Sequence, residues 1–554
     1  MRSHPAPPAG SLDRRAFLGR VAAASAAFAL SPAHGALGVE TPASGAEPGA
    51  VALPPADERG VADLAGALAL GETTARALVE ACLARIEALD ARGPALRAVI
   101  ERNPDALAIA DRLDQERKDG KVRGPLHGIP ILIKDNIDSA DRMKTSAGSL
   151  ALANSTPPRD AFIVERLRAA GAVLLGKTNL SEWANFRSTR STSGWSGRGG
   201  LTRNPHVLDR SACGSSSGTG AAVAAGYVPL GIGTETDGSI ICPSSICGIV
   251  GIKPTLGLWS RSGIIPISAS QDTAGPMTRS VADAAALLGP LAGPDPRDAA
   301  TQTSPGTAED YSRFLDRGGL KGARIGVARN LASGFHPDID RAFGEALAAL
   351  KDAGAVLVDP ANLETLGKFD EAEYEVLLYE FKAGMAAYLE ALGPAAPAKT
   401  LDDLFAFNEK ERAREMPFFG QEIFEQAKGK GPLTDKAYRA ARAKCVKLTR
   451  KEGIDATLAK HKLEAIVAPS NGPSWPIDLV NGDRYTGGNT SFAAVAGYPS
   501  VTVPMGFVHD LPLGLSFLGA AWTEGKLIRL AYAFEQATMI RRAPRFLATT
   551  PSPA

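Results

Sequence analysis

Two serines and one lysine offer the parts of a hydrolytic site. Ser215 and Ser239 lie 24 residues apart in a glycine-dense segment, and Lys134 precedes them at the end of an apolar stretch. A serine hydroxyl is a poor nucleophile at neutral pH unless a base removes its proton. No histidine lies between residues 128 and 205. If the chain is a serine hydrolase, we therefore expect its base not to be histidine.

Lys134 can serve as that base only where burial keeps its amine neutral. Desolvation lowers the pKa of a lysine, and the three residues before Lys134 are Ile, Leu and Ile. This alternating, β-branched stretch predicts a strand that enters the core. The alternative is a surface lysine, or one paired with Asp135 or Asp138.

The segment at residues 214–220 is rich in glycine and serine. Glycine permits close approach of backbone segments and unusual dihedral angles. A serine held there could relay a proton between a lysine and a second serine. The alternative is a flexible linker. Residues 221–225 read Ala-Ala-Val-Ala-Ala, which predicts the start of a buried helix and argues against a linker.

Ser239 ends the sequence Thr-Glu-Thr-Asp-Gly-Ser and precedes an apolar stretch. The glycine before it permits a tight turn that faces a cavity. Successive N–H groups at such a turn can bind the oxyanion that forms when a carbonyl carbon is attacked.

Together these three segments resemble the amidase signature family, over residues 61–536. The resemblance implies that Ser239 is the acyl-forming nucleophile. It implies that Ser215, after a cis peptide bond, bridges to Lys134, the general base and acid. It further implies an oxyanion hole from backbone amides and no metal or cofactor. The amides belong to Thr236, Asp237, Gly238 and Ser239.

Two departures from the usual sequence of the family point to a subgroup within it. Asp237 stands where the family most often has glycine, and the usual Ser-Ser-Gly-Gly loop reads Ser-Ser-Ser-Gly at residues 215–218. These features, with residues 264–277 and 416–421, are similar to those of bacterial peptide amidases. The expected substrates are C-terminal peptide amides or small acyl amides. The alternatives are the glutaminase subunit of a tRNA-dependent amidotransferase and a catalytically silent periplasmic binding protein.

Two other motifs match by pattern alone. Residues 171–178 fit the phosphate-loop pattern, but their middle reads Ala-Val-Leu-Leu, which predicts a strand instead of an anion-binding turn. Residues 214–218 fit the nucleophile-elbow pattern with Ser216 as nucleophile, yet no buried strand precedes them. His127 lies near Lys134 in the sequence, and we expect a structural role for it.

Strand and helix patterns alternate up to residue 290 and return after residue 461, which predicts one α/β domain over residues 57–545. The amidase resemblance implies a central mixed sheet covered by helices on both faces. Residues 57–300 and 461–545 are the expected core. Residues 300–460 are an expected helical excursion that walls or caps the site.

The chain of 554 residues has a formal net charge of +1, which gives no electrostatic case for nucleic acid. Residues 1–35 resemble a twin-arginine export signal, followed by a linker at residues 36–56. The apolar run at residues 21–30 is too short to span a bilayer. We therefore expect a periplasmic or secreted protein without stable membrane association. The five cysteines have irregular spacing, so we expect small buried side chains and not a disulfide framework.

Overall fold

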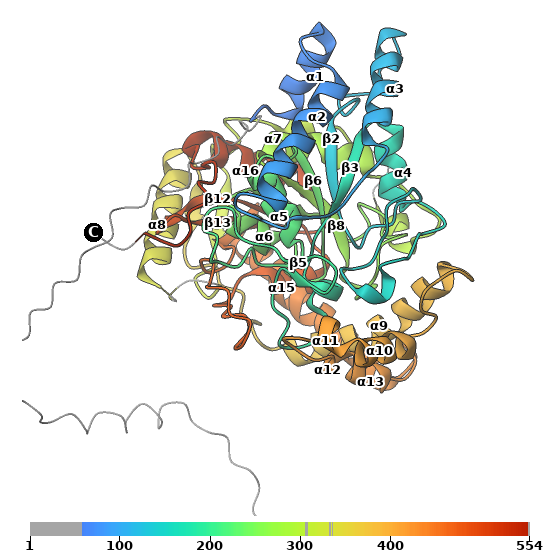
Figure 1. Cartoon of the computed structure of the whole chain (residues 1–554). Helices are drawn as coiled ribbons and strands as arrows, with labels where there is room; N and C mark the ends of the chain where they lie inside the picture. Colours follow the sequence, from blue (N-terminus) through green and yellow to red (C-terminus); the bar gives the residue numbers. More distant parts are fainter. Residues whose placement is uncertain (1–57, 305–308, 332–333, 335, 552–554) are drawn as a thin grey trace, which may run out of the picture. The chain divides into compact units, whose positions relative to one another are not determined.

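An eleven-stranded mixed sheet forms the centre of the computed structural model, which describes residues 58–304, 309–331, 334 and 336–551 (Figure 1). Its strand order is β1-β3-β2-β6-β8-β7-β12-β13-β11-β9-β10. Strands β2, β3 and β6 run parallel to one another, as do β9, β10 and β11, and the remaining pairs are antiparallel. The strands are β1 (Val99–Arg102), β2 (Pro130–Lys134), β3 (Val173–Thr178), β6 (Leu230–Glu235), β7 (Val250–Lys253), β8 (Thr273–Thr278), β9 (Arg324–Val327), β10 (Val356–Val358), β11 (Ala465–Pro469), β12 (Ser500–Val508) and β13 (Leu511–Leu518).

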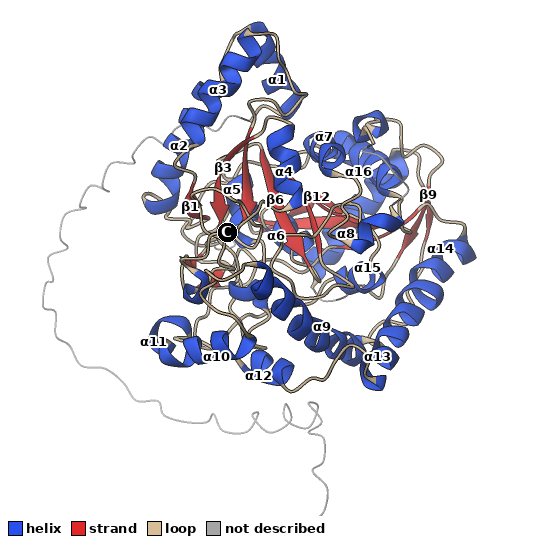
Figure 2. Cartoon of the chain, turned by 90° about the vertical axis from the view of Figure 1, so that its right-hand side faces the viewer, coloured by secondary structure: helices blue, strands red, loops and turns tan. Residues whose placement is uncertain are grey.

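Helices cover both faces of the sheet (Figure 2). Helices α4, α7, α8 and α16 pack with the larger core cluster, and α2, α3 and α5 pack with the second. The helices are α1 (Val61–Leu70), α2 (Ala75–Ile86), α3 (Ala106–Lys118), α4 (Phe162–Ala169), α5 (Ser217–Ala224), α6 (Ile241–Ile246), α7 (Val281–Leu291), α8 (Pro337–Asp352), α9 (Asp370–Ala391), α10 (Leu401–Lys410), α11 (Arg412–Glu415), α12 (Glu422–Lys428), α13 (Lys436–Val446), α14 (Asp455–His461), α15 (Thr490–Ala496) and α16 (Glu524–Thr538).

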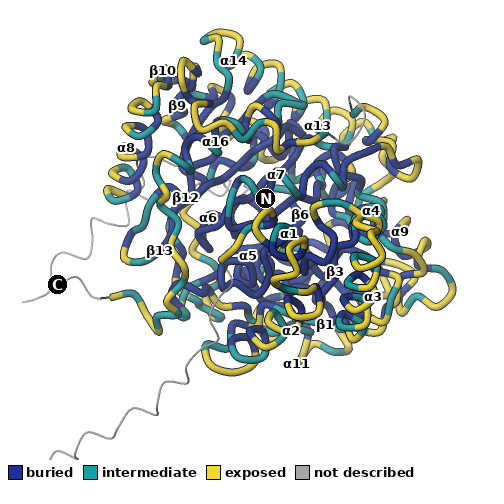
Figure 3. Tube along the Cα trace, turned by 90° about the horizontal axis from the view of Figure 1, so that it is seen from above, coloured by how far each residue is buried: buried dark blue, intermediate teal, exposed yellow. Residues whose placement is uncertain are grey.

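Strand β2 shows how the sequence assigns residues to the two faces. Side chains alternate across a strand, and accordingly Ile131 and Ile133 join the larger core cluster whereas Leu132 joins the second. Lys134 shares the side of Leu132, which helix α5 covers. Every residue of α5 is buried, in contrast to the exposed outer side of α3 (Figure 3). The lysine is thus directed into the interior between sheet and helix.

The expected helical excursion over residues 300–460 is wrong for its first part. Strands β9 and β10 join the edge of the central sheet in parallel, and α8 connects them as a crossover helix. These strands have four and three residues, too short for a clear alternation pattern. The helical part is α9 to α14, of which α9 to α13 gather beside the sheet in Figures 1 and 2.

Helices α9, α10 and α12 share a third apolar cluster with residues that precede the Gly/Ser segment. Phe381 of α9 and Phe424 of α12 pack with Trp183 and Phe186. The helical part of the excursion therefore packs against the segment that precedes residues 214–220. The expected export signal and linker lie outside the described residues. Among the residues that the structure describes, no helix is long and apolar enough to cross a membrane.

Candidate active site

Lys134 ends β2 and is completely buried. The parallel register pairs Ile133 with Ile232, which brings the lysine to Thr234 near the end of β6. Its Nζ donates to the Ser215 Oγ at 2.7 Å, to the Thr234 Oγ1 at 2.9 Å and to the Thr234 carbonyl at 3.1 Å. Asn136 Nδ2 also donates to the Thr234 Oγ1, at 2.9 Å.

Burial lowers the pKa of Lys134 to about 7, against the opposing attraction of Asp272 and then Glu235. Desolvation disfavours the ammonium form, which explains the direction. A neutral amine has two N–H donors and one lone pair. With both N–H groups on Thr234, the lone pair of Lys134 faces the hydroxyl of Ser215, so the geometry suits a base.

Ser215 opens the segment that leads into α5, and it is completely buried. The peptide bond between Gly214 and Ser215 is cis, as the family resemblance implies. The N–H of Ser181 donates to the Ser215 carbonyl at 3.1 Å, and the N–H of Ser216 donates to the Ser239 carbonyl at 3.1 Å. The two serine segments are therefore joined through their backbones.

The Ser216 hydroxyl is engaged elsewhere. It donates to the Thr234 carbonyl at 3.1 Å and accepts from the Thr234 N–H at 3.2 Å. This side chain fastens the segment to β6, a structural task. Of these two neighbouring serines, Ser215 is the one whose hydroxyl is hydrogen-bonded to Lys134.

Ser239 closes the turn between β6 and α6, with 7% of its surface exposed. Gly238 has a φ of +79°, and a Cβ there would approach the Thr490 Oγ1 to 3.1 Å, so both conformation and space favour glycine. The Glu235 carboxylate accepts from the N–H groups of Ile240 and Ile241 at 2.8 and 2.9 Å.

The backbone of this turn has unused donors. Within the described residues, the N–H groups of Asp237, Gly238 and Ser239 show no hydrogen bond. Unpaired N–H donors are what an oxyanion hole requires. A small cavity lies beside Ser215 and Thr236. It is lined by Asn136, Ala184, Ser215, Thr234, Glu235, Thr236, Arg261, Ile264, Ile265, Ile267, Asp272 and Thr273.

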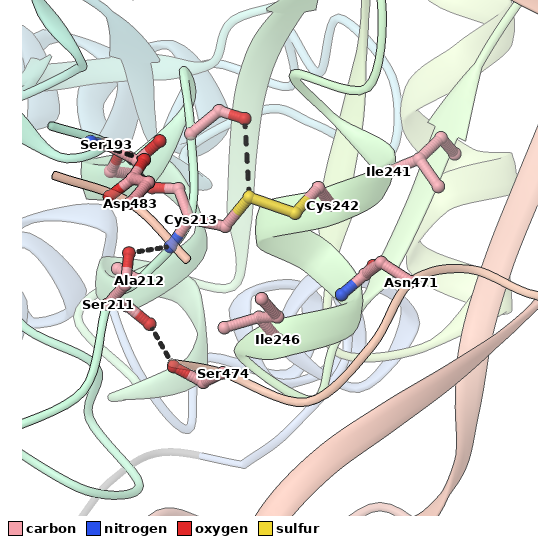
Figure 4. Close-up of a disulfide and its surroundings, with 12 residues drawn as sticks. Ser193, Ser211, Ala212, Cys213, Ile241, Cys242, Ile246, Asn471, Ser474 and Asp483 are labelled. Carbon is pink, nitrogen blue, oxygen red and sulfur yellow. Dashed lines mark hydrogen bonds between the residues drawn. A yellow bond between two sulfur atoms is a disulfide. The ribbon is translucent and has the colours of Figure 1, made fainter. Parts of the chain in front are cut away.

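Cys213 and Cys242 form a disulfide, which corrects the expectation that the cysteines are only small buried side chains (Figure 4). Their Cα atoms are 6.2 Å apart although the residues are separated by 29 positions. The pairing arises because α5 and α6 both cover the sheet, and their N-terminal approaches converge. Cys213 precedes Ser215 by two residues and Cys242 follows Ser239 by three, so the disulfide joins the two serine segments. Cys247 and Cys445 are buried without a disulfide, as expected.

Two other expectations are confirmed. Residues Val173–Thr178 form β3, so the phosphate-loop pattern is a strand. His127 is buried with its Nε2 2.9 Å from the Leu113 carbonyl, which ties its loop to α3.

Within the described residues, no group of three or more His, Cys, Asp or Glu side chains could hold a metal ion.

Sequence reasoning missed Thr234 and Asp272. Thr234 lies in the segment that contains Ser239, but its role depends on the pairing of β2 with β6. Asp272 lies in residues 264–277, a stretch marked only for its similarity to peptide amidases. The antiparallel register pairs Glu235 with Thr273, and this brings Asp272 opposite Thr236. Only the register of two distant strands could have revealed either residue.

Known proteins resemble the chain over most of its length. The family model "Amidase" matches residues 77–528. The native peptide amidase of Stenotrophomonas maltophilia is 54% identical, with a TM-score of 0.85 over 88% of this chain and 99% of that one. A probable amidase of Arabidopsis thaliana is 41% identical over 86% of this chain and 89% of the relative. A glutamyl-tRNA(Gln) amidotransferase subunit of Chloroflexus aurantiacus is 37% identical over 85% and 95%, respectively.

These matches agree with the large mixed sheet that helices cover. The chain belongs to the amidase signature family and is an amide hydrolase.

Proposed function

We propose that the chain hydrolyses C-terminal peptide amides or small acyl amides, with Ser239, Ser215 and Lys134 as its catalytic triad. The observation that carries the proposal is the 2.7 Å contact between the buried Lys134 Nζ and the Ser215 Oγ. The backbone hydrogen bond from Ser216 to Ser239 supports the proposal, because it joins the segment of the proposed nucleophile to the segment of Ser215.

In the proposed reaction, the Ser239 Oγ attacks the amide carbonyl carbon. Its proton passes through the Ser215 hydroxyl to the Lys134 amine. The N–H groups of Asp237, Gly238 and Ser239, with that of Thr236, bind the developing oxyanion. Lys134 then returns the proton through Ser215 to the departing nitrogen, and the C–N bond breaks. Water hydrolyses the acyl-enzyme by the reverse relay, which releases the carboxylic acid and restores the triad.

The peptide-amide substrate class is supported by the 54% identity to the Stenotrophomonas maltophilia peptide amidase. The Asp237 side chain gives it local support, because its Oδ2 accepts from the Ser491 Oγ at 2.6 Å beside the nucleophile turn. Burial raises the pKa of Asp237, and burial together with the nearby Asp237 raises the pKa of Glu373 of α9. An aspartate and a glutamate offer no cation that would bind a substrate carboxylate at this turn, which favours a substrate that ends in a neutral amide.

Ammonia release from a panel of amides tests the substrate class. The panel is a C-terminal peptide amide, benzamide, a fatty acid amide and free glutamine, and each is compared between wild type and Ser239→Ala. We expect turnover of the peptide amide that depends on Ser239. Turnover only of simple amides would discard the peptide class. Turnover only of glutamine would favour the amidotransferase alternative. A chain that neither turns over any of them nor reacts with a fluorophosphonate serine probe would be a binding protein.

We also propose that residues 1–35 direct export by the twin-arginine route. The support is the sequence Asp-Arg-Arg-Ala-Phe-Leu at residues 13–18, followed by a short apolar run. Replacement of Arg14 and Arg15 by lysine is expected to retain the protein in the cytoplasmic fraction of a producing bacterium. Unchanged recovery from the periplasmic fraction would contradict this route.

A further inference from the structure

Asp272 lies where the loop that follows β7 enters β8, and its side chain joins two walls of the candidate site. Its Oδ1 accepts from the Thr236 Oγ1 at 2.6 Å. Thr236 is the first residue of the turn that ends at Ser239. The pairing of Glu235 with Thr273 places the two residues opposite each other. This contact therefore follows from the register of the sheet.

The other carboxyl oxygen holds the opposite wall. Asp272 Oδ2 accepts from the N–H groups of Ile267 and Ser268 at 2.8 and 2.9 Å. Ile267 and Asp272 both line the cavity next to Ser215. One carboxyl group thus connects the turn at residues 236–239, the proposed oxyanion turn, to the loop that contributes Ile267 to the cavity.

Asp272 is also the strongest attractive charge that acts on Lys134, followed by Glu235. The Glu235 carboxylate is engaged by the N–H groups at the start of α6. Arg261 lines the same cavity, but its Nε and Nη2 donate to Asp298 at 2.9 and 2.6 Å. Of the two carboxyl groups that attract Lys134, Asp272 therefore exerts the larger attraction, and Arg261 attracts Asp272 in turn.

The two groups can carry opposite charges at the same time. Burial raises the pKa of Asp272 to about 6, whereas burial lowers the pKa of Lys134 to about 7. At and above neutral pH, Asp272 is consequently mainly a carboxylate.

We propose that Asp272 is a positioning residue that fixes the oxyanion turn through Thr236 and stabilises Lys134 while the lysine holds the proton of the nucleophile. This inference rests on the proposed roles of Lys134 and Ser239. The proton moves from the Ser239 Oγ through Ser215 to the Lys134 Nζ and then to the leaving nitrogen. Asp272 takes no proton at any step and acts only by its charge and its hydrogen bonds.

The test is the dependence of kcat/KM on pH, with a C-terminal peptide amide as substrate. In the wild type we expect a limb that rises with pH near pH 7. Asp272→Asn removes the charge that favours the ammonium, so the limb should move to lower pH by about one unit or more. The high-pH plateau should fall by about tenfold or more, because a weaker base accepts the proton less readily. Asp272→Glu retains the charge and should keep the limb near its wild-type position.

A second variant tests the hydrogen bond without the charge. Thr236→Val removes the donor to Asp272, so the plateau at high pH, where Asp272 is a carboxylate in either protein, should fall by about tenfold. The rate of labelling by a fluorophosphonate probe over the same pH range gives a readout that needs no substrate. The midpoint of denaturant unfolding shows whether each variant is folded.

The outcomes separate this inference from the proposed function. A wild-type limb that Asp272→Asn leaves unmoved would overturn the role of the charge while Lys134 remains the base. A Thr236→Val plateau equal to that of the wild type would overturn the positioning role, even if Asp272→Asn does not fold. A wild type without any limb near pH 7 would instead remove Lys134 as the base, and the proposed function would fail with it.

Discussion

The Nζ of Lys134 lies 2.7 Å from the Oγ of Ser215 in a setting where neither residue has any exposed surface. Strand β2 brings the lysine to this point, and the segment before α5 brings the serine. Among the residues that the structure describes, the other hydrogen bonds of the amine both go to Thr234. The lysine therefore has one direction in which to exchange a proton, and that direction is Ser215.

Activity should rise with pH through the pKa of Lys134. Only the neutral amine can accept the nucleophile's proton, and burial places its pKa at about 7. Below that value the active fraction falls about tenfold for each pH unit, and above it the rate levels off. Measurement of kcat/KM from about pH 5.5 to about pH 9, with the fold checked at each pH, tests this. A rate that decreases steadily above neutrality in folded protein would count against lysine.

Lys134→Met should abolish most turnover without removing the burial of the side chain. Methionine has a similar length and no basic nitrogen, so we expect a loss of at least about 10³-fold in kcat, on the scale of other acyl-transfer sites. Lys436→Met, on the outer helix α13, is a matched control and should have wild-type activity. A Lys134→Met enzyme within tenfold of the wild type would show that another group is the base.

The Cys213–Cys242 disulfide should support both stability and activity, because it joins the segments of Ser215 and Ser239. Replacement of both cysteines by alanine should lower the free energy of unfolding by about 2–4 kcal/mol, as expected for loss of a cross-link over a loop of this length. Cys247→Ala, at a buried cysteine outside the disulfide, is the control for a lost thiol.

Turnover gives the second readout for the disulfide. The double alanine variant should lose activity beyond what its unfolded fraction explains, and a dithiol reductant should do the same to the wild type. Reduced protein with full activity and an unchanged unfolding midpoint would mean that backbone contacts alone hold the two serine segments.

A buried ionic cluster should anchor the helical excursion to the wall of the cavity. The Arg187 guanidinium contacts Glu182 in its own segment and lies 3.6 Å from Glu415 of α11, with all three side chains buried. Arg187→Met leaves two carboxylates without their cation and should cost about 3–5 kcal/mol of stability. Arg412→Met breaks an exposed pair with Glu409 and should cost about 1 kcal/mol or less. Equal unfolding midpoints for the two variants would refute the anchoring role.

Local patterns predicted the parts of the site, whereas the structure was needed for its arrangement. The apolar residues before Lys134 correctly indicate a buried strand, and the alanine-rich stretch after Gly220 indicates a buried helix. The partners of Lys134 at Thr234 depend on the register between β2 and β6, which are about 100 residues apart. No local pattern contains that information.

The same limit explains the errors. The disulfide requires two helices to converge on one face of the sheet, and the irregular cysteine spacing does not show it. Strands β9 and β10 have too few residues for a visible alternation, so the segment reads as helical. Asp272 is one of many acidic residues until the pairing of β6 with β8 places it opposite Thr236.

The identity of the nucleophile is the central claim, and covalent labelling tests it most directly. The protein would be treated with a fluorophosphonate serine probe, digested, and the labelled residue located by mass spectrometry. We predict that Ser239 is labelled and that the Ser239→Ala variant is not. We also predict that C-terminal peptide amides slow the labelling of Ser239 by competition. A label on Ser216, or on any serine outside residues 215–239, would contradict the account.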